Sequence, residues 1–82
     1  MTGELMEVKV LFFGVLSEVA GTSVKHYIGV KTVDDLKLRI IDDFPEIVHY
    51  SYRISVNNEI TDNNLILETG DEIALMPPFA GG

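Results

Sequence analysis

The sequence contains no cysteine in its 82 residues. Disulfide bonds, thiolate metal sites and a cysteine nucleophile are therefore excluded within this chain. If sulfur chemistry is involved, the sulfur must be supplied by another molecule. Long hydrophobic runs are also missing, because no segment reaches the roughly 18 apolar residues of a membrane-spanning helix. The sequence accordingly predicts no association with a membrane.

Basic residues are scarce: 6 Lys and Arg stand against 13 Asp and Glu, which gives a net charge of −7. This balance disfavours nucleic acid as a partner, because the phosphate backbone attracts Lys and Arg. An acidic chain suits a basic protein surface and gains association rate from it. The charge can equally serve only to keep a small protein soluble. The acidic start, residues 1–7, lacks the basic and then apolar order of a signal peptide, which predicts a cytoplasmic protein.

The chain is long enough for one small domain and too short for two. Because 46% of its residues are hydrophobic, it can form a core without covalent help. We therefore expect a single domain over residues 1–82, in which residues 77–82 form a flexible C-terminal tail.

Two strands are predicted in the first part of the sequence. Residues 8–13 are rich in β-forming types, and their alternation places Leu11 and Phe13 on the face away from the core. Residues 16–21 favour a helical turn closed by a glycine. Residues 23–30 then predict a second strand, antiparallel to the first and joined to it by a loop.

A helix after Thr32 is the clearest element. Thr32 suits the N-cap position, and Asp34 and Asp35 lie in the first turn, where the helix dipole favours negative charge. Pro45 ends the helical pattern because it cannot donate a backbone hydrogen bond. The apolar residues that recur at helical spacing are Val33, Leu36, Ile40, Ile41 and Phe44.

The second half of the sequence predicts short strands. One covers residues 52–56, and Asn57-Asn58 marks a turn, since Asn tolerates left-handed backbone geometry. Ile60 lies on a short return strand, and residues 72–76 form the last strand. Pro77-Pro78 prevents further pairing and favours an extended path.

This order of elements predicts the α+β class. We expect a β-grasp, or ubiquitin-like, arrangement: a mixed sheet of four to five strands with one main helix packed on one face. In such an arrangement the first and last strands lie parallel at the centre of the sheet, and the C-terminal tail projects from it.

No set of side chains in the sequence supports independent catalysis. Neighbouring carboxylates, as in Asp34-Asp35 and Asp42-Asp43, point in different directions on a helix and are best explained as helix-end charges. The two histidines lack metal-ligand spacing, the serines lie in no nucleophile elbow, and the glycines form no phosphate-binding loop. We therefore expect this chain to bind no metal and no cofactor.

The sheet face away from the helix is the first candidate site. Phe13 and Met76 are expected side by side on neighbouring central strands, with Ile60 beside them on the return strand. An exposed apolar patch near a tail is typical of a partner site; a loop or the tail that covers the patch is the alternative. Phe79 is predicted to anchor the tail in a partner's groove, or to fold back on its own domain.

The C-terminal Gly81-Gly82 is the second candidate site. Glycine has no Cβ, so this end can thread a narrow channel and present a bare carboxylate to another enzyme. A carboxylate is a poor electrophile until one of its oxygens becomes a leaving group. Activation as an acyl-adenylate is therefore the expected first step before a nucleophile is loaded.

These segments resemble the small subunit of molybdopterin synthase, the MoaD family of ubiquitin-like sulfur carriers. The resemblance rests on residues 8–14, 18–22 and 56–60, and above all on residues 70–82, which read GDEIALMPPFAGG. The two prolines in this segment favour the molybdopterin carrier over the thiamine carrier. Phe79-Ala80 departs from the Val, Ser or Thr common in the family, which affects groove fit rather than chemistry.

The resemblance implies that an adenylating enzyme related to ubiquitin activators uses MgATP to activate the Gly82 carboxylate, and that a sulfur donor protein converts it to a thiocarboxylate. The loaded tail then enters the large synthase subunit and delivers sulfur to cyclic pyranopterin monophosphate, which builds the dithiolene that binds molybdenum or tungsten. The synthase is a heterotetramer in which this chain is the non-catalytic small subunit. The residues implied to bind partners are Phe13, Ile60, Met76, Pro77, Pro78, Phe79 and Ala80.

Other functions share the same features. A ubiquitin-like protein modifier would join its C-terminus to a target lysine, and related carriers serve tRNA thiolation or thiamine synthesis. A non-covalent binding module has no use for a bare Gly-Gly end, and a free-standing enzyme lacks catalytic groups here. The sequence separates the carrier and modifier functions poorly.

Overall fold

A computed structural model of the chain describes residues 6–78. The expectations for Phe79, Ala80, Gly81 and Gly82 fall outside the described residues. In chain order the elements are β1 (Glu7–Phe12), α1 (Val15–Ala20), β2 (Val24–Ile28), α2 (Val33–Asp43), the 3₁₀ helix η1 (Pro45–His49), β3 (Arg53–Val56), β4 (Glu59–Thr61) and β5 (Glu72–Met76).

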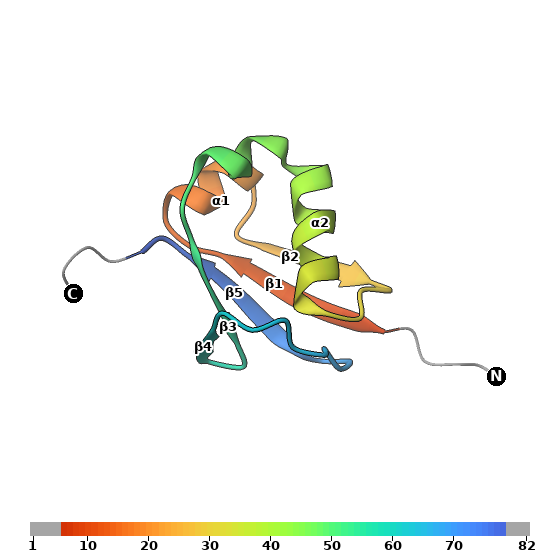
Figure 1. Cartoon of the computed structure of the whole chain (residues 1–82). Helices are drawn as coiled ribbons and strands as arrows, with labels where there is room; N and C mark the ends of the chain where they lie inside the picture. The colour runs from red at the N-terminus through yellow and green to blue at the C-terminus, as the bar shows by residue number, and fades with distance from the viewer. Residues whose placement is uncertain (1–5, 79–82) are drawn as a thin grey trace.

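The strands form one five-stranded mixed sheet in the order β2-β1-β5-β3-β4. The first and last strands, β1 and β5, lie parallel at its centre, and each of the other pairings is antiparallel. Figure 1 shows α1 and α2 on the same side of this sheet, while the other side carries no helix within residues 6–78. The predicted α+β class and ubiquitin-like β-grasp arrangement are confirmed.

Helix α2 forms for the reasons that the sequence indicates. The Thr32 side chain accepts a hydrogen bond from the Asp35 backbone N–H at 3.1 Å, which satisfies one free donor of the first turn. The helix ends at Asp43, two residues before Pro45. Pro45 then opens η1, which the sequence analysis did not predict. The fixed φ of Pro45 suits the first position of a helix. Ile47 of η1 is completely buried.

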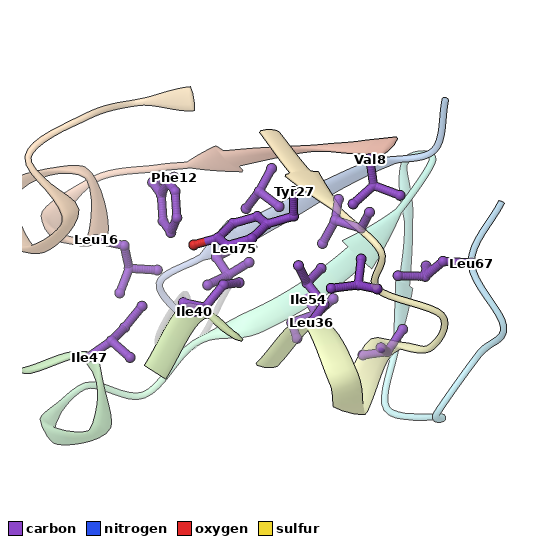
Figure 2. Packing of buried hydrophobic residues seen from close by; sticks show 14 residues of the cluster. Val8, Phe12, Leu16, Tyr27, Leu36, Ile40, Ile47, Ile54, Leu67 and Leu75 are labelled. Atoms are coloured by element: carbon purple, nitrogen blue, oxygen red, sulfur yellow. The ribbon is translucent and has the colours of Figure 1, made fainter. Parts of the chain in front are cut away.

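The core lies between the sheet and α2. Figure 2 shows its labelled side chains converging from the strands, from both α-helices and from η1. The residues of β1 and β5 that face the helices are all buried, which matches the alternation of a strand with one covered face. The buried cluster consists of Val8, Val10, Phe12, Leu16, Tyr27, Val30, Val33, Leu36, Ile40, Ile47, Ile54, Leu67, Ile73 and Leu75.

Strand β2 is shorter than predicted and turns its aromatic residue inward. It ends before Gly29, whose φ of 85° leaves the extended region. Tyr27 is buried because the register pairs it with Val8, a core residue of β1. The two aliphatic residues Val24 and Ile28 are exposed on the opposite face. Composition alone therefore gives the wrong impression of which face of β2 is covered.

A polar and aromatic contact joins β2 to the end of α2. The Lys25 ammonium lies 3.5 Å from the Asp43 carboxylate and 5.5 Å from the ring centroids of both Tyr27 and Phe44. The Tyr27 hydroxyl lies near the same carboxylate but forms no hydrogen bond of regular geometry with any residue in 6–78. Burial, and then Asp43, raises the pKa of Tyr27. The Tyr27 hydroxyl lowers the pKa of Asp43, burial opposes this, and Lys25 and Arg39 lower it further.

This contact generates a prediction about acid stability. Asp43 has a lowered pKa in the folded state. Its contribution to folding stability is therefore fully present above the unfolded-state pKa near 3.8, and this contribution is lost as the pH falls through the lower folded-state pKa. We expect Asp43→Asn to lower Tm by roughly 1–5 °C at pH 7, the range for a partly exposed ion pair in a small domain. Below that pH window the two proteins should unfold at similar temperatures. Thermal unfolding by circular dichroism over a series from pH 7 down to pH 2 tests this, and a difference in Tm that stays the same across the whole series would contradict it.

Candidate functional site

The open face of the sheet carries a continuous row of side chains. The register pairs Leu11 of β1 with Ala74 of β5, Ala74 with Ser55 of β3, and Ser55 with Ile60 of β4. Paired residues on neighbouring strands point to the same face. Because the alternate residues of β5, such as Leu75, face the core, this row faces away from α1 and α2.

A second row lies beside the first, at the end of the sheet where β5 terminates. Met76 pairs with Arg53, and Phe13 follows directly after β1, next to β5. Phe13 is 46% exposed and Ile60 is 57% exposed, while Met76 is half-buried. The structure therefore brings together the three residues that were expected to form an apolar patch. Their role in binding a partner stays a prediction.

A shallow hollow of about 250 Å³ lies between these two rows, and Asn58 and Glu72 close its remaining side. Leu11 was predicted on this face, but the sequence indicates no hollow there. Finding it requires the register of three separate strand pairs, which no local sequence pattern gives. The lining residues are Leu11, Phe13, Ser55, Asn58, Ile60, Glu72, Ala74 and Met76.

The edge of this face at the start of β5 is polar and is held in place by side-chain hydrogen bonds. The Asn57 side chain donates to the Asp71 carboxylate at 3.0 Å and accepts from the Glu72 backbone N–H at 3.0 Å. These bonds hold the start of β5 against the turn between β3 and β4. Lys9 lies 3.7 Å from Glu72, and both side chains are partly exposed. An exposed ion pair of this kind contributes only about 0–1 kcal/mol to folding stability, so the Lys9–Glu72 pair adds little to the stability of the fold.

The beginning of the tail rests on the turn between β1 and α1. The Phe13 N–H donates to the Leu75 carbonyl at 3.0 Å. Gly14 follows with φ 58°, and a Cβ added there would lie 3.0 Å from Pro77 Cγ. Pro77 is half-buried and Pro78 is exposed. Figure 1 shows the chain leaving β5 beside this turn. The turn therefore sets where the tail departs, next to Phe13 and Met76.

The described residues offer little to a metal or to catalysis. Within 6–78 there is no group of three or more His, Cys, Asp or Glu that could hold a metal ion. No helix over the same residues is long and apolar enough to cross a membrane. The features that remain on the open face are an apolar surface and the start of the tail.

A sequence model of the ThiS family matches residues 10–82, nearly the whole chain. The chain belongs to the ThiS family. This family comprises ubiquitin-like sulfur carriers related to MoaD, so the resemblance seen in the sequence is confirmed at that level.

Solved structures with the same fold come from both carriers and modifiers. The small archaeal modifier protein 1 from Methanosarcina acetivorans is 29% identical, with a TM-score of 0.80 over 98% of this chain and 100% of that one. A chain in the complex of subunits 1 and 2 of the molybdopterin-converting factor from Helicobacter pylori is 28% identical, with a TM-score of 0.71 over 94% and 100% of the two chains. A putative molybdopterin converting factor subunit 1 from Pyrococcus furiosus shares the fold at 21% identity, with a TM-score of 0.83 over 90% and 99%.

The turn under the tail generates a second prediction. Gly14→Ala should lower the free energy of unfolding by about 2–4 kcal/mol, because a Cβ at positive φ is strained and also crowds Pro77. In a Pro77→Ala background the ring is gone, so the same substitution should cost about 1 kcal/mol less. Urea unfolding of the wild type, both single variants and the double variant measures this coupling. Equal costs in the two backgrounds would show that the contact with Pro77 carries no energy.

Proposed function

We propose that this chain is the sulfur carrier subunit of a molybdopterin synthase. In this role the Gly82 carboxylate is adenylated, converted to a thiocarboxylate, and used to donate sulfur to cyclic pyranopterin monophosphate. The observation that carries the proposal is the 28% identity, over 94% of this chain, to a chain in the complex of the two molybdopterin-converting factor subunits. The apolar open face beside the tail supports it independently.

The loading chemistry needs a bare C-terminus and no catalytic group of this chain. On the adenylating enzyme, a carboxylate oxygen of Gly82 attacks the α-phosphorus of MgATP, and pyrophosphate leaves. A hydrosulfide equivalent from the sulfur donor protein then attacks the acyl carbon, and AMP leaves. A side chain at position 82 would crowd this carbon, whereas glycine leaves it open.

Docking on the large subunit is assigned to the open face. Phe13, directly after β1, Ile60 on β4 and Met76 on β5 present apolar surface on elements that the sheet holds rigidly relative to one another. Burial of such a patch against a partner supplies affinity without any large change of conformation. The tail begins at the same edge of the face, so docking and tail insertion are parts of one event.

The length of the tail limits where the partner's reaction centre lies. Five residues, 78–82, span at most about 18 Å when fully extended. The large subunit must therefore place its sulfur-accepting site within that distance of the Pro77 position. Because this chain carries a net charge of −7, a basic channel on the partner would also attract it.

Protein modification is the second candidate. The 29% identity to the small archaeal modifier protein 1 over 98% of this chain specifically favours it. The activation step is the same, and the outcomes differ in the nucleophile that takes the acyl group: sulfur for the carrier, and a target lysine amine for the modifier.

The C-terminal proposal is tested by changing only the length of the chain. We expect deletion of Gly82, or addition of one residue after it, to abolish thiocarboxylate formation and molybdopterin synthesis, because the acyl carbon is displaced from both active sites. Intact-mass spectrometry after incubation with the adenylating enzyme, MgATP and the sulfur donor detects the exchange of one oxygen for sulfur. Circular dichroism serves as the control for an unchanged fold.

Either of two results would overturn the carrier proposal. One is a Gly82-deleted chain that still supports molybdopterin synthesis with the same partners. The other is a wild-type chain that is recovered from its own cells joined through its Gly82 carboxyl group to the lysines of many proteins, without a thiocarboxylate. The second result would favour the modifier.

The docking face is tested by a charge placed at its exposed aromatic residue. Phe13→Asp should weaken binding to the large subunit by roughly tenfold or more, because central aromatic residues dominate interface affinity. Leu38→Asp is the matched control: Leu38 is 67% exposed on α2, which covers the other side of the sheet. Isothermal titration calorimetry should show wild-type affinity for this control. Equal affinities of the two variants would contradict the assignment of the face.

A further inference from the structure

The floor of the hollow on the open face is made of two small residues. Ala74 and Ser55 point away from the helices, yet they are only 9% and 5% exposed. Their low exposure comes from larger neighbours that stand around them. Three sides are apolar, with Leu11 at one end of the central row, Ile60 at the other end, and Phe13 with Met76 in the adjacent row.

The depth of the hollow follows from the order of large and small residues across the strands. Cβ atoms of directly paired residues lie about 4.5–5.5 Å apart, so an alanine and a serine side by side between larger residues leave a gap one side chain deep. The fourth side is polar: Asn58 and Glu72 close it, and Glu72 is already paired with Lys9 at 3.7 Å.

We infer that this hollow is a socket for one large apolar side chain of the synthase large subunit, of leucine, methionine or phenylalanine type, and that Ala74 and Ser55 set the size of that side chain. The inference rests on the proposed function and names the feature that the partner must present. A volume of about 250 Å³ falls below the roughly 300–1,000 Å³ of pockets that hold small organic ligands. It suits a single side chain, and the apolar walls favour one without charge.

A partner side chain bound in this socket would contribute strongly to the binding affinity. Binding energy concentrates where a large residue fills a desolvated pocket and surrounding contacts exclude water. Here Phe13, Ile60 and Met76 form the surrounding contacts, while Ala74 and Ser55 are already shielded and cost little to desolvate.

The socket also lies in register with the tail. Met76 forms one of its walls and directly precedes Pro77, and Ala74 lies three residues before Pro77, about 10 Å along the strand. A partner residue bound in the socket therefore fixes the position on the partner's surface at which the tail begins. The socket would determine both the choice of partner and the position of the carrier's end.

The test fills the socket. Ala74→Leu should weaken binding to the purified large subunit by at least roughly tenfold in calorimetry, because the added side chain occupies the space of the partner's residue. Ser55→Val fills the same floor from β3 and should act in the same direction, which covers the case that one variant does not fold. Ser51→Leu adds similar bulk on an exposed loop outside the hollow and should leave the affinity unchanged.

A size exchange identifies the occupant. Among single alanine replacements of apolar residues on the contact surface of the large subunit, one should bind Ala74→Leu more tightly than it binds the wild-type chain. Affinities of folded Ala74→Leu and Ser55→Val within twofold of the wild type would overturn the socket while leaving the carrier function intact. Failure of the wild-type chain to bind the large subunit would instead overturn the proposed function itself.

Discussion

The parallel pairing of β1 with β5 at the centre of the sheet is the interaction on which the other features depend. It joins the two ends of the domain, since β1 begins at Glu7 and β5 ends at Met76. Val10, Phe12, Ile73 and Leu75 build the middle of the core from these two strands. The opposite faces of the same strands supply the centre of the apolar surface. The strand that carries the tail is thus an inner strand of the sheet, with a partner on each side.

The separation of the two faces lets one small sheet form the core on one side and offer the other side for the partner binding that we propose. Within residues 6–78 the helices cover one face, so the core needs only one layer of inward residues. The other face then remains available, and its residues are constrained by pairing rather than by packing. Ala74 and Leu75 are neighbours in the chain, yet one lies in a hollow at the surface and the other is in the centre of the core.

The sequence predicts those elements whose signals are local. Thr32, the two aspartates after it and Pro45 mark α2 at both ends, and β5 has the bounds 72–76 that its composition and the following prolines indicate. Asn57 and Asn58 adopt the positive φ values that favour them in a turn. What could not be predicted depends on register. The covered face of β2 is set by the pairing of Tyr27 with Val8, and the hollow by four strands in alignment.

A carrier of this kind needs precision at only one point, the place where its tail begins. In the proposed function the domain contributes to the partner's reaction by delivering its end in a fixed position, which is an entropic contribution to that chemistry. The parallel pairing of β5, the glycine turn under Pro77 and the open face beside Met76 involve the same few residues. Beyond that point, glycine offers the least obstruction to entry and the least restraint on conformation. The sheet that holds β5 and the glycine residues at the end of the sequence are therefore complementary requirements of the delivery function that we propose.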